Sequence, residues 1–133
     1  NFFDATVEDG TLVTDQFDFP LSAATLDDLD GADSVRLGVR PEDIELVDEA
    51  TGDHDYGATV DVVEPLGNEN NVYLTFDGDD ETFTAVVPAT DAVEAGDHVV
   101  ARIPEDAVHV FDTDSGVALH NRAFEADEEA IPQ

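Results

Sequence analysis

Short runs of β-branched and aromatic residues recur about once every ten to twelve residues, and this rhythm limits the chain to a few fold classes. Clusters of Asp, Gly and Asn separate the runs, as they do in turns between strands. No convincing helical period continues for more than two turns. The sequence therefore predicts an all-β barrel or sandwich. The expected strands are residues 2–7, 11–13, 17–21, 35–39, 44–47, 58–63, 72–76, 82–87, 98–103 and 107–111.

Turn residues indicate how several of these strands connect. Asp9-Gly10 predicts a hairpin between the first two runs, because both residues tolerate positive φ angles. Similar chemistry predicts hairpin turns at residues 77–80 and 112–116. Pro20 marks its run as an edge strand because proline has no N–H to donate. Residues 26–32 are expected to form a short helical turn or loop.

Carboxylates dominate the surface that these strands would present. The chain has 34 acidic residues against four basic ones, all arginines, and a formal net charge of −30. The acids alternate with apolar stretches, and hydrophobic residues make up 41% of the chain, which argues against an acidic, partly disordered protein. Salt relieves carboxylate repulsion, because the Debye length falls from about 10 Å at 0.1 M to about 3 Å at 1 M. The composition therefore indicates adaptation to a salt-saturated cytoplasm, as in haloarchaea.

The absence of lysine and cysteine excludes several kinds of chemistry. A P-loop and a Schiff-base enzyme both need a lysine, and a zinc–thiolate site or a disulfide needs cysteine. Nucleic acid and anionic membranes would meet a strongly negative protein, so we expect neither as a partner. No apolar run approaches the roughly 18 residues of a membrane-spanning helix. Because the chain also lacks methionine and opens at Asn1, we expect it to be a piece of a longer protein.

No motif indicates a catalytic or metal site. Residues 77–81 and 112–116 carry several acids, but Asp and Gly are also what hairpin turns require. The histidines are scattered without metal-binding spacing, and the serines lie outside any nucleophile motif. We therefore expect these side chains to be structural. They are His54, His98, His109, His120, Ser22, Ser34 and Ser115.

Two of the four arginines lie close together in residues 35–44. On a single strand, Arg36 and Arg40 would point to the same face, because side chains alternate. Scarce cations placed together suggest a designed contact with a ligand or a subunit. The alternative is an internal ion pair, for instance between Arg40 and Glu42, that fixes the turn at Pro41.

Four segments, in order along residues 1 to about 120, match motifs of one known family. The segment Leu-Gly-Val-Arg-Pro-Glu-Asp-Ile at residues 37–44 is similar to a Leu-Gly-Ile-Arg-Pro-Glu-His signature. Residues 1–10 are similar to the junction motif of that family, residues 60–73 to a Glu-Pro-Leu-Gly motif, and residues 95–116 to an Ala-Gly-Asp and His-Leu-Phe-Asp pair of motifs. Together they resemble the C-terminal regulatory domain of MalK-type sugar ABC importer ATPases. Asp43 departs from the family pattern, which has histidine there.

The resemblance implies a TOBE-type, OB-like β-barrel of short antiparallel strands over residues 1–121, with at most short helical turns. It implies that residues 122–133 form an acidic, poorly ordered tail and that the ATPase domain lies upstream, outside this chain. The implied function is a non-catalytic regulatory and dimerisation domain of a sugar or glycerol-phosphate importer. Its partners would be a second copy, the ATPase domain and, indirectly, the membrane permease subunits. ATP and Mg would belong to the parent chain alone, at the cytoplasmic face of the membrane.

The resemblance also suggests where contacts form, with no catalytic, cofactor-binding or metal-binding residue in this chain. The expected regulatory or subunit contact comprises Arg36, Arg40, Pro41, Glu42, Pro65, Leu66 and Gly67. The expected junction to the ATPase domain comprises Asn1, Phe2 and Phe3. An alternative function is a small-ligand or oxyanion sensor, for which Arg36 and Arg40 are the candidate cations. A nucleic-acid OB module is excluded by the charge.

Overall fold

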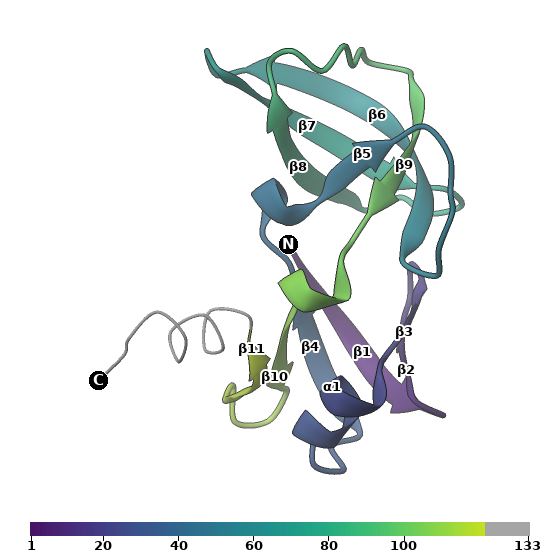
Figure 1. Ribbon diagram of the computed structural model, residues 1–133, viewed down its shortest axis with the longest axis vertical. Helices are drawn as coiled ribbons and strands as arrows, with labels where there is room; N and C mark the ends of the chain where they lie inside the picture. Colours follow the sequence, from purple (N-terminus) through teal and green to yellow (C-terminus); the bar gives the residue numbers. More distant parts are fainter. Residues whose placement is uncertain (122–133) are drawn as a thin grey trace. The chain divides into compact units, whose positions relative to one another are not determined.

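A computed structural model describes residues 1–121, and in this part antiparallel strands form two sheets with little helix (Figure 1). The predicted all-β class with short helical turns is confirmed. Sheet A contains, in spatial order, β11 (Ala118–Asn121), β10 (His109–Asp112), β4 (Ser34–Gly38), β1 (Phe2–Glu8), β2 (Thr11–Thr14) and β3 (Asp18–Pro20). Sheet B contains β5 (Glu45–Val47), β9 (His98–Arg102), β6 (Asp55–Pro65), β7 (Glu69–Phe76) and β8 (Thr82–Pro88). The short helices are α1 (Ala23–Asp28), η1 (Pro41–Asp43) and η2 (Glu105–Ala107).

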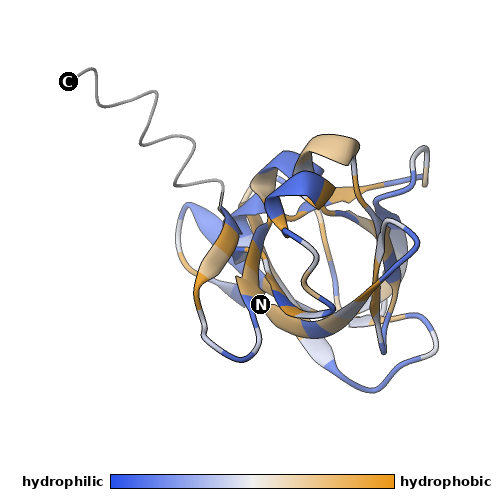
Figure 2. Cartoon of the chain, turned by 90° about the horizontal axis from the view of Figure 1, so that it is seen from below, coloured by the Kyte–Doolittle hydropathy of each residue, from blue (hydrophilic) through white to orange (hydrophobic). Residues whose placement is uncertain are grey.

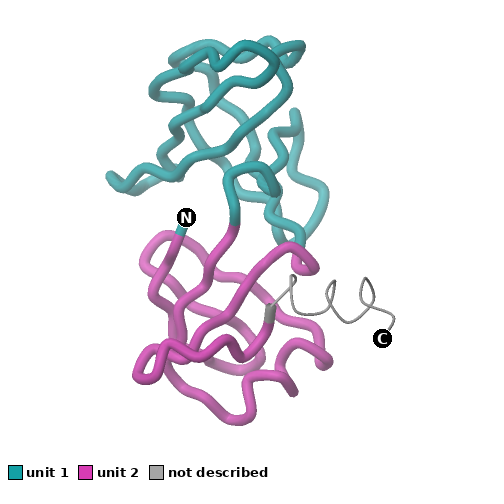
Figure 3. The backbone as a smooth tube through the Cα atoms, turned by 90° about the vertical axis from the view of Figure 1, so that its left-hand side faces the viewer, with its two compact units in different colours: residues 1, 40–104 teal, residues 2–39, 105–133 magenta. Residues whose placement is uncertain are grey.

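The described chain divides into two compact units (Figure 3). Unit 1 contains residue 1 and residues 40–104, and unit 2 contains residues 2–39 and, within the described part, residues 105–121. Each unit has buried apolar residues of its own, such as Val60 in unit 1 and Leu12 in unit 2. The predicted domain boundary at residue 121 stays a prediction, and the predicted tail at residues 122–133 lies outside the described residues.

Sheet B forms unit 1 and curls on itself, because its outer strands β5 and β8 approach each other. Its core is built by alternate residues of the long strands, as expected for a sheet with one buried face. Val60, Val72 and Leu74 are at most 1% exposed, and the rings of Phe76 and Phe83 stack with their centroids 4.0 Å apart. Figure 2 shows apolar and polar segments alternating along the strands.

Sheet A forms unit 2 and confirms the local turn predictions. Asp9 and Gly10 have φ angles of 51° and 75°, and they close the β1–β2 hairpin. β3, which ends at Pro20, is an edge strand as predicted. The helical turn begins earlier than expected, at Ala23, because the Ser22 hydroxyl accepts a hydrogen bond from the Thr25 amide and caps it. Strand β11 was not predicted, since its four residues include no β-branched or aromatic side chain.

Within residues 1–121, no helix combines the length and the apolar character needed to cross a lipid bilayer.

Candidate subunit-contact site

The predicted contact residues fall into two groups, because strand β4 ends at Gly38. Arg36 lies on β4 in unit 2, whereas Arg40 lies beyond the strand in unit 1 and precedes η1. The prediction that both arginines point to one face of a single strand is therefore wrong. Pro41 ends the extended run, since it supplies no N–H and its fixed φ suits the first position of a helical turn.

The turn at Arg40 is fixed by backbone bonds. The Asp43 amide donates to the Arg40 carbonyl at 3.0 Å, and the Ile44 amide donates to the Pro41 carbonyl at 3.3 Å. Ile44, which is 1% exposed, then anchors the end of the turn in the core. The Arg40 side chain is exposed, and the structure records no ion pair or hydrogen bond for it within residues 1–121. The predicted alternative, a pair with Glu42, is therefore not formed among the described residues.

The second predicted segment, residues 65–67, forms the tip of the β6–β7 hairpin in the same unit. The Leu66 amide donates to the Glu69 carbonyl at 2.7 Å, which closes the turn. Gly67 has a φ of +95°, a conformation that side-chain-bearing residues rarely adopt. The Asn68 carbonyl accepts from the Ala89 amide at 2.9 Å, so the tip is tied to the end of β8. The Leu66 side chain is left 53% exposed.

A hollow of about 340 Å³ on unit 1 is lined by Glu42 and by the residues that follow the hairpin tip. Glu42 comes from η1, Asn68 and Glu69 come from the hairpin, and β8 supplies the remaining walls. Of the predicted contact residues, only Glu42 lines this hollow, and the hairpin contributes the two residues that follow Gly67. Sequence reasoning missed the β8 residues, because an ordinary strand carries no motif. The residues lining this hollow are Glu42, Asn68, Glu69, Val86, Val87 and Pro88.

The predicted junction residues are divided between the units. The Asn1 side chain forms two hydrogen bonds with the backbone of Thr84 on β8. Its Nδ2 donates to the Thr84 carbonyl at 2.8 Å, and its Oδ1 accepts from the Thr84 amide at 2.9 Å. Phe2 and Phe3 belong to β1, where Phe3 is buried and Phe2 is 66% exposed. Asn1 is therefore fastened to β8, a strand of its own unit that also borders the contact hollow.

Arg36 and Arg102 already have acidic partners. Arg36 Nε lies 3.2 Å from Asp4 Oδ1 on the surface of unit 2. Arg102 donates to both carboxylate oxygens of Asp55, at 2.8 and 3.0 Å. These contacts, together with the Thr51 and Gly52 amides, outweigh burial and hold the pKa of Asp55 far below its ordinary value. Both arginines are structural ion-pair partners in the described chain.

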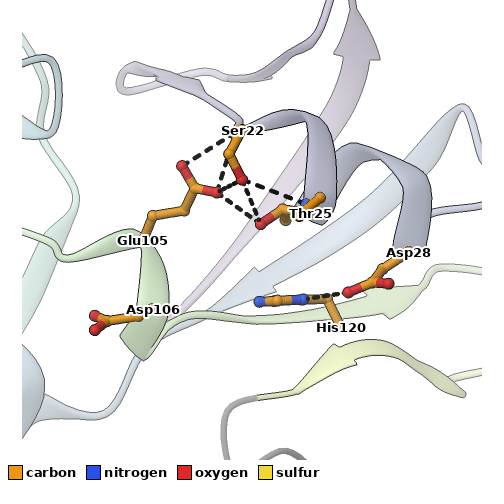
Figure 4. Close-up of a pocket in the computed structure, with 7 residues that line it drawn as sticks. Ser22, Thr25, Asp28, Glu105, Asp106 and His120 are labelled. Carbon is orange, nitrogen blue, oxygen red and sulfur yellow. Dashed lines mark hydrogen bonds and ion pairs between the residues drawn. The ribbon is translucent and has the colours of Figure 1, made fainter.

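A second hollow, in unit 2, contains a histidine and two hydroxyl groups (Figure 4). Glu105 accepts hydrogen bonds from the hydroxyls of Ser22 and Thr25, each at 2.6 Å. His120 Nδ1 lies 2.9 Å from Asp28 Oδ2, and no hydrogen bond from His120 to either hydroxyl is described. Both hydroxyls are bonded to the Glu105 carboxylate and the imidazole is bonded to Asp28, so these residues do not form the hydroxyl–imidazole pair of a serine hydrolase. The two contacts fasten α1 to η2 and to β11.

The histidines in strands have structural surroundings, as expected. His98 lies 2.9 Å from Asp77, and His109 packs against Phe111. Within the described residues, no three His, Asp or Glu side chains are placed to hold a metal ion. The acids of the β10–β11 turn are engaged locally, since Asp112 accepts from the Ser115 amide and hydroxyl. The pKa of Asp112 is lowered, chiefly by the hydrogen bond from the Ser115 hydroxyl. Burial alone would raise this pKa, and the amides of Ser115 and Asp114 help to lower it.

These observations define a class of protein: a small module of antiparallel strands in two compact units, as described for residues 1–121. Comparison with known families agrees with this class. Residues 37–111 match the TOBE domain, and residues 1–46 match the CysA C-terminal regulatory domain. The chain belongs to the TOBE domain family.

Relatives of known sequence share most of this chain. It is 48% identical over 124 residues to the xylose/arabinose import ATP-binding protein XacK of Haloferax volcanii, covering 92% of this chain and 32% of that protein. It is 38% identical over 130 residues to XacJ of the same organism, covering 92% and 34%. It is 43% identical over 82 residues to the maltose/maltodextrin import ATP-binding protein MalK of Photobacterium profundum, covering 62% and 22%. The chain therefore spans about a third, or less, of these relatives.

A solved structure supports the fold independently. The cytoplasmic molybdate-binding protein ModG superimposes with a TM-score of 0.67 over 83% of this chain and 94% of that chain. The sequence identity is only 16%, so the likeness concerns the fold alone. It confirms the predicted OB-like, TOBE-type architecture.

Proposed function

We propose that this chain is the non-catalytic regulatory and dimerisation domain of the ATP-binding subunit of a carbohydrate-type ABC importer. The relatives named above are ATP-binding subunits of sugar importers, and another is a glycerol-3-phosphate import subunit from Rhizobium johnstonii, 31% identical over 80 residues. The ATPase domain, ATP and Mg would belong to the parent protein. The domain would work at the cytoplasmic face of the membrane, with a second copy and the permease subunits as its partners.

The observation that carries the proposal is the hollow on unit 1, which Glu42 of η1 lines together with Asn68 and Glu69 of the β6–β7 hairpin. Basic side chains are scarce on a chain that has four of them and a net charge of −30. Here an exposed arginine, without a recorded partner in the described part, lies next to the turn that borders the hollow, and an exposed leucine lies on the hairpin tip. Such a surface can meet another subunit at a lower electrostatic cost than the acidic coat.

The alternative function, an oxyanion sensor, has less support. Arg36 and Arg102 are paired with aspartates, which leaves Arg40 as the remaining cation within residues 1–121. Glu42 and Glu69 line the adjacent hollow, and their charges would repel an anion there. Adaptation to high salt also belongs to this proposal, and it rests on the acid-rich composition and on the haloarchaeal relatives.

Charge insertion at the hollow tests the proposal in the parent subunit. Leu66→Asp places a carboxylate at the hairpin tip, and Thr82→Asp adds the same charge at an exposed position at the start of β8. We expect Leu66→Asp and Arg40→Glu to weaken dimerisation or transport while Thr82→Asp does not. Equal effects of Leu66→Asp and Thr82→Asp would show that the contact lies elsewhere. Unfolding of the isolated chain by Arg40→Glu would show that this arginine is structural.

A further inference from the structure

The second hollow, on unit 2, has three carboxylates and an imidazole in its wall, and no arginine of the described residues lines it. Its volume of about 370 Å³ lies at the small end of the range for small-molecule sites, about 300–1,000 Å³. The walls come from α1, η2 and β11, which all belong to this unit. The polar lining residues are Ser22, Thr25, Asp28, Glu105, Asp106 and His120.

His120 is a polar side chain that is almost completely buried at this hollow. The side chain is 7% exposed, and its Nδ1 lies 2.9 Å from Asp28 Oδ2. An ionised carboxylate can only accept a hydrogen bond, so Nδ1 carries the proton and the Nε2 of the neutral ring keeps a lone pair. The structure records no partner for Nε2 within residues 1–121. Figure 4 shows this end of the ring pointing away from Asp28, into the hollow on the side of η2.

The two hydroxyl groups in the wall do not satisfy Nε2, because Glu105 holds them. The Ser22 and Thr25 hydroxyls each donate to Glu105 Oε2 at 2.6 Å, and the Ser22 amide donates to the same oxygen at 3.0 Å. Asp106 is exposed, and no partner is recorded for it in the described part of the chain. The hollow therefore presents hydrogen-bond acceptors from three elements: Asp28 on α1, Asp106 on η2 and His120 Nε2 on β11.

A wall of this kind selects a ligand by its charge and by its hydrogen-bonding groups. An anion would meet three carboxylates without a cation to offset them. A metal ion held by protein side chains needs more ligands than the described residues bring together. A guanidinium group fits, because it carries a positive charge and several N–H donors in one plane. Such a group can donate to acceptors on different elements at the same time.

We propose that this hollow binds a small organic cation of the alkylguanidinium type, whose N–H groups donate to His120 Nε2 and to the carboxylates of Asp28 and Asp106. Asp28 also fixes the tautomer and orientation of the imidazole, as carboxylates do for histidines that bind metal ions. The bound cation would join α1, η2 and β11, so its binding would stabilise unit 2. This inference does not depend on the proposed importer function.

NMR titration with butylguanidinium in multimolar KCl tests the proposal. Butylurea is the matched control ligand, because it has nearly the same shape and also carries N–H donors, but it has no charge. We expect saturable shifts of the Thr25, Asp28 and Asp106 amide signals and of the His120 Nε2 resonance with butylguanidinium, and much smaller shifts with butylurea. The ring resonances of His54 and His98 are internal controls, since both residues lie in unit 1.

Two substitutions separate the hollow from the general acidic surface. A hydrogen bond to a charged group is strong enough that Asp106→Asn should weaken butylguanidinium binding by about tenfold or more. Asp27→Asn removes the same charge from an exposed position on α1 that does not line the hollow. We expect this control to change the affinity by less than about twofold.

Any of four results would overturn the proposal. The first is an absence of saturable shifts with butylguanidinium. The second is an equal response to butylurea, which would mean that charge does not select the ligand. The third is a His120 Nε2 resonance that does not move when the amide shifts are saturated. The fourth is equal weakening by Asp27→Asn and Asp106→Asn, because that would assign the binding to the acidic surface as a whole.

Discussion

Replacing Asp55 with asparagine should destabilise the protein by about 3 kcal/mol near neutral pH. The Asp55 side chain is 2% exposed, and its carboxylate accepts hydrogen bonds from Arg102 and from the amides of Thr51 and Gly52, at 2.8 and 3.1 Å. A hydrogen bond to a charged group contributes about 1.5–3 kcal/mol, and breaking a buried ion pair costs about 3–5 kcal/mol. The Arg102 side chain is 34% exposed, so water compensates part of the loss and the lower end of that range applies.

The loss should depend on pH in a defined direction. The contacts with Arg102 and the two amides depress the pKa of Asp55 in the folded protein. A depressed folded pKa means that the stabilisation is present above the unfolded value of about 3.9 and is lost as the pH falls. The difference between the wild type and Asp55→Asn should therefore be constant from about pH 7 to about pH 5. Below about pH 3.9 it should shrink by up to about 1.4 kcal/mol per pH unit.

Urea unfolding followed by circular dichroism in multimolar KCl measures this difference, because urea leaves the ionic strength unchanged. Asp53→Asn is the matched control, since it removes the same charge from an exposed position in the same loop. We expect this control to remain within about 0.5 kcal/mol of the wild type. An equal effect of the two substitutions, or a difference that grows as the pH falls below about 4, would refute the reasoning.

Three further predictions concern unit 2 and the charge. Glu105→Gln should lower the free energy of unfolding by about 1–3 kcal/mol, because Glu105 accepts bonds from the Ser22 amide and hydroxyl; Asp106→Asn is the exposed control. Gly38→Ala should change the free energy of unfolding by no more than about 1 kcal/mol, because the exposed ring of Phe2 can move away from the added Cβ, and Phe2→Ala in the same chain should remove this effect in a double-mutant cycle. In a KCl series, cooperative structure should appear well above about 0.1 M, and a melting transition that is equally sharp in dilute buffer would contradict the role assigned to salt.

The strands and hairpins were predictable because their signals are local. Alternating β-branched residues and the Asp9-Gly10 turn determine strand and hairpin without reference to distant residues. β11 was missed because its strand conformation comes from pairing with β10, which a four-residue run of Ala, Leu, His and Asn does not reveal. The division into two units also escaped prediction, since it depends on the chain leaving sheet A after β4 and returning after residue 104.

The two turns of the candidate site could be located in the sequence for the same reason. The two turns at Pro41 and Gly67 have residue types that local backbone geometry requires, so the motifs could be located in the sequence. The error about Arg36 and Arg40 arose from extending a period of two through a strand that ends at Gly38. The β8 wall of the hollow depends on tertiary contacts between η1 and β8, for which the sequence has no local signal.

The central claim is that this domain regulates and dimerises an ATPase subunit without taking part in ATP chemistry. Its most direct test compares the full-length parent subunit with a version truncated before Asn1, by sedimentation velocity and MgATP titration in multimolar KCl. We predict that the truncated subunit still binds MgATP with unchanged affinity but loses the dimer that the full-length subunit forms without nucleotide, and that the isolated domain gives no binding heat. A truncated subunit that dimerises as strongly as the full-length protein, or specific MgATP binding by the isolated domain, would contradict the account.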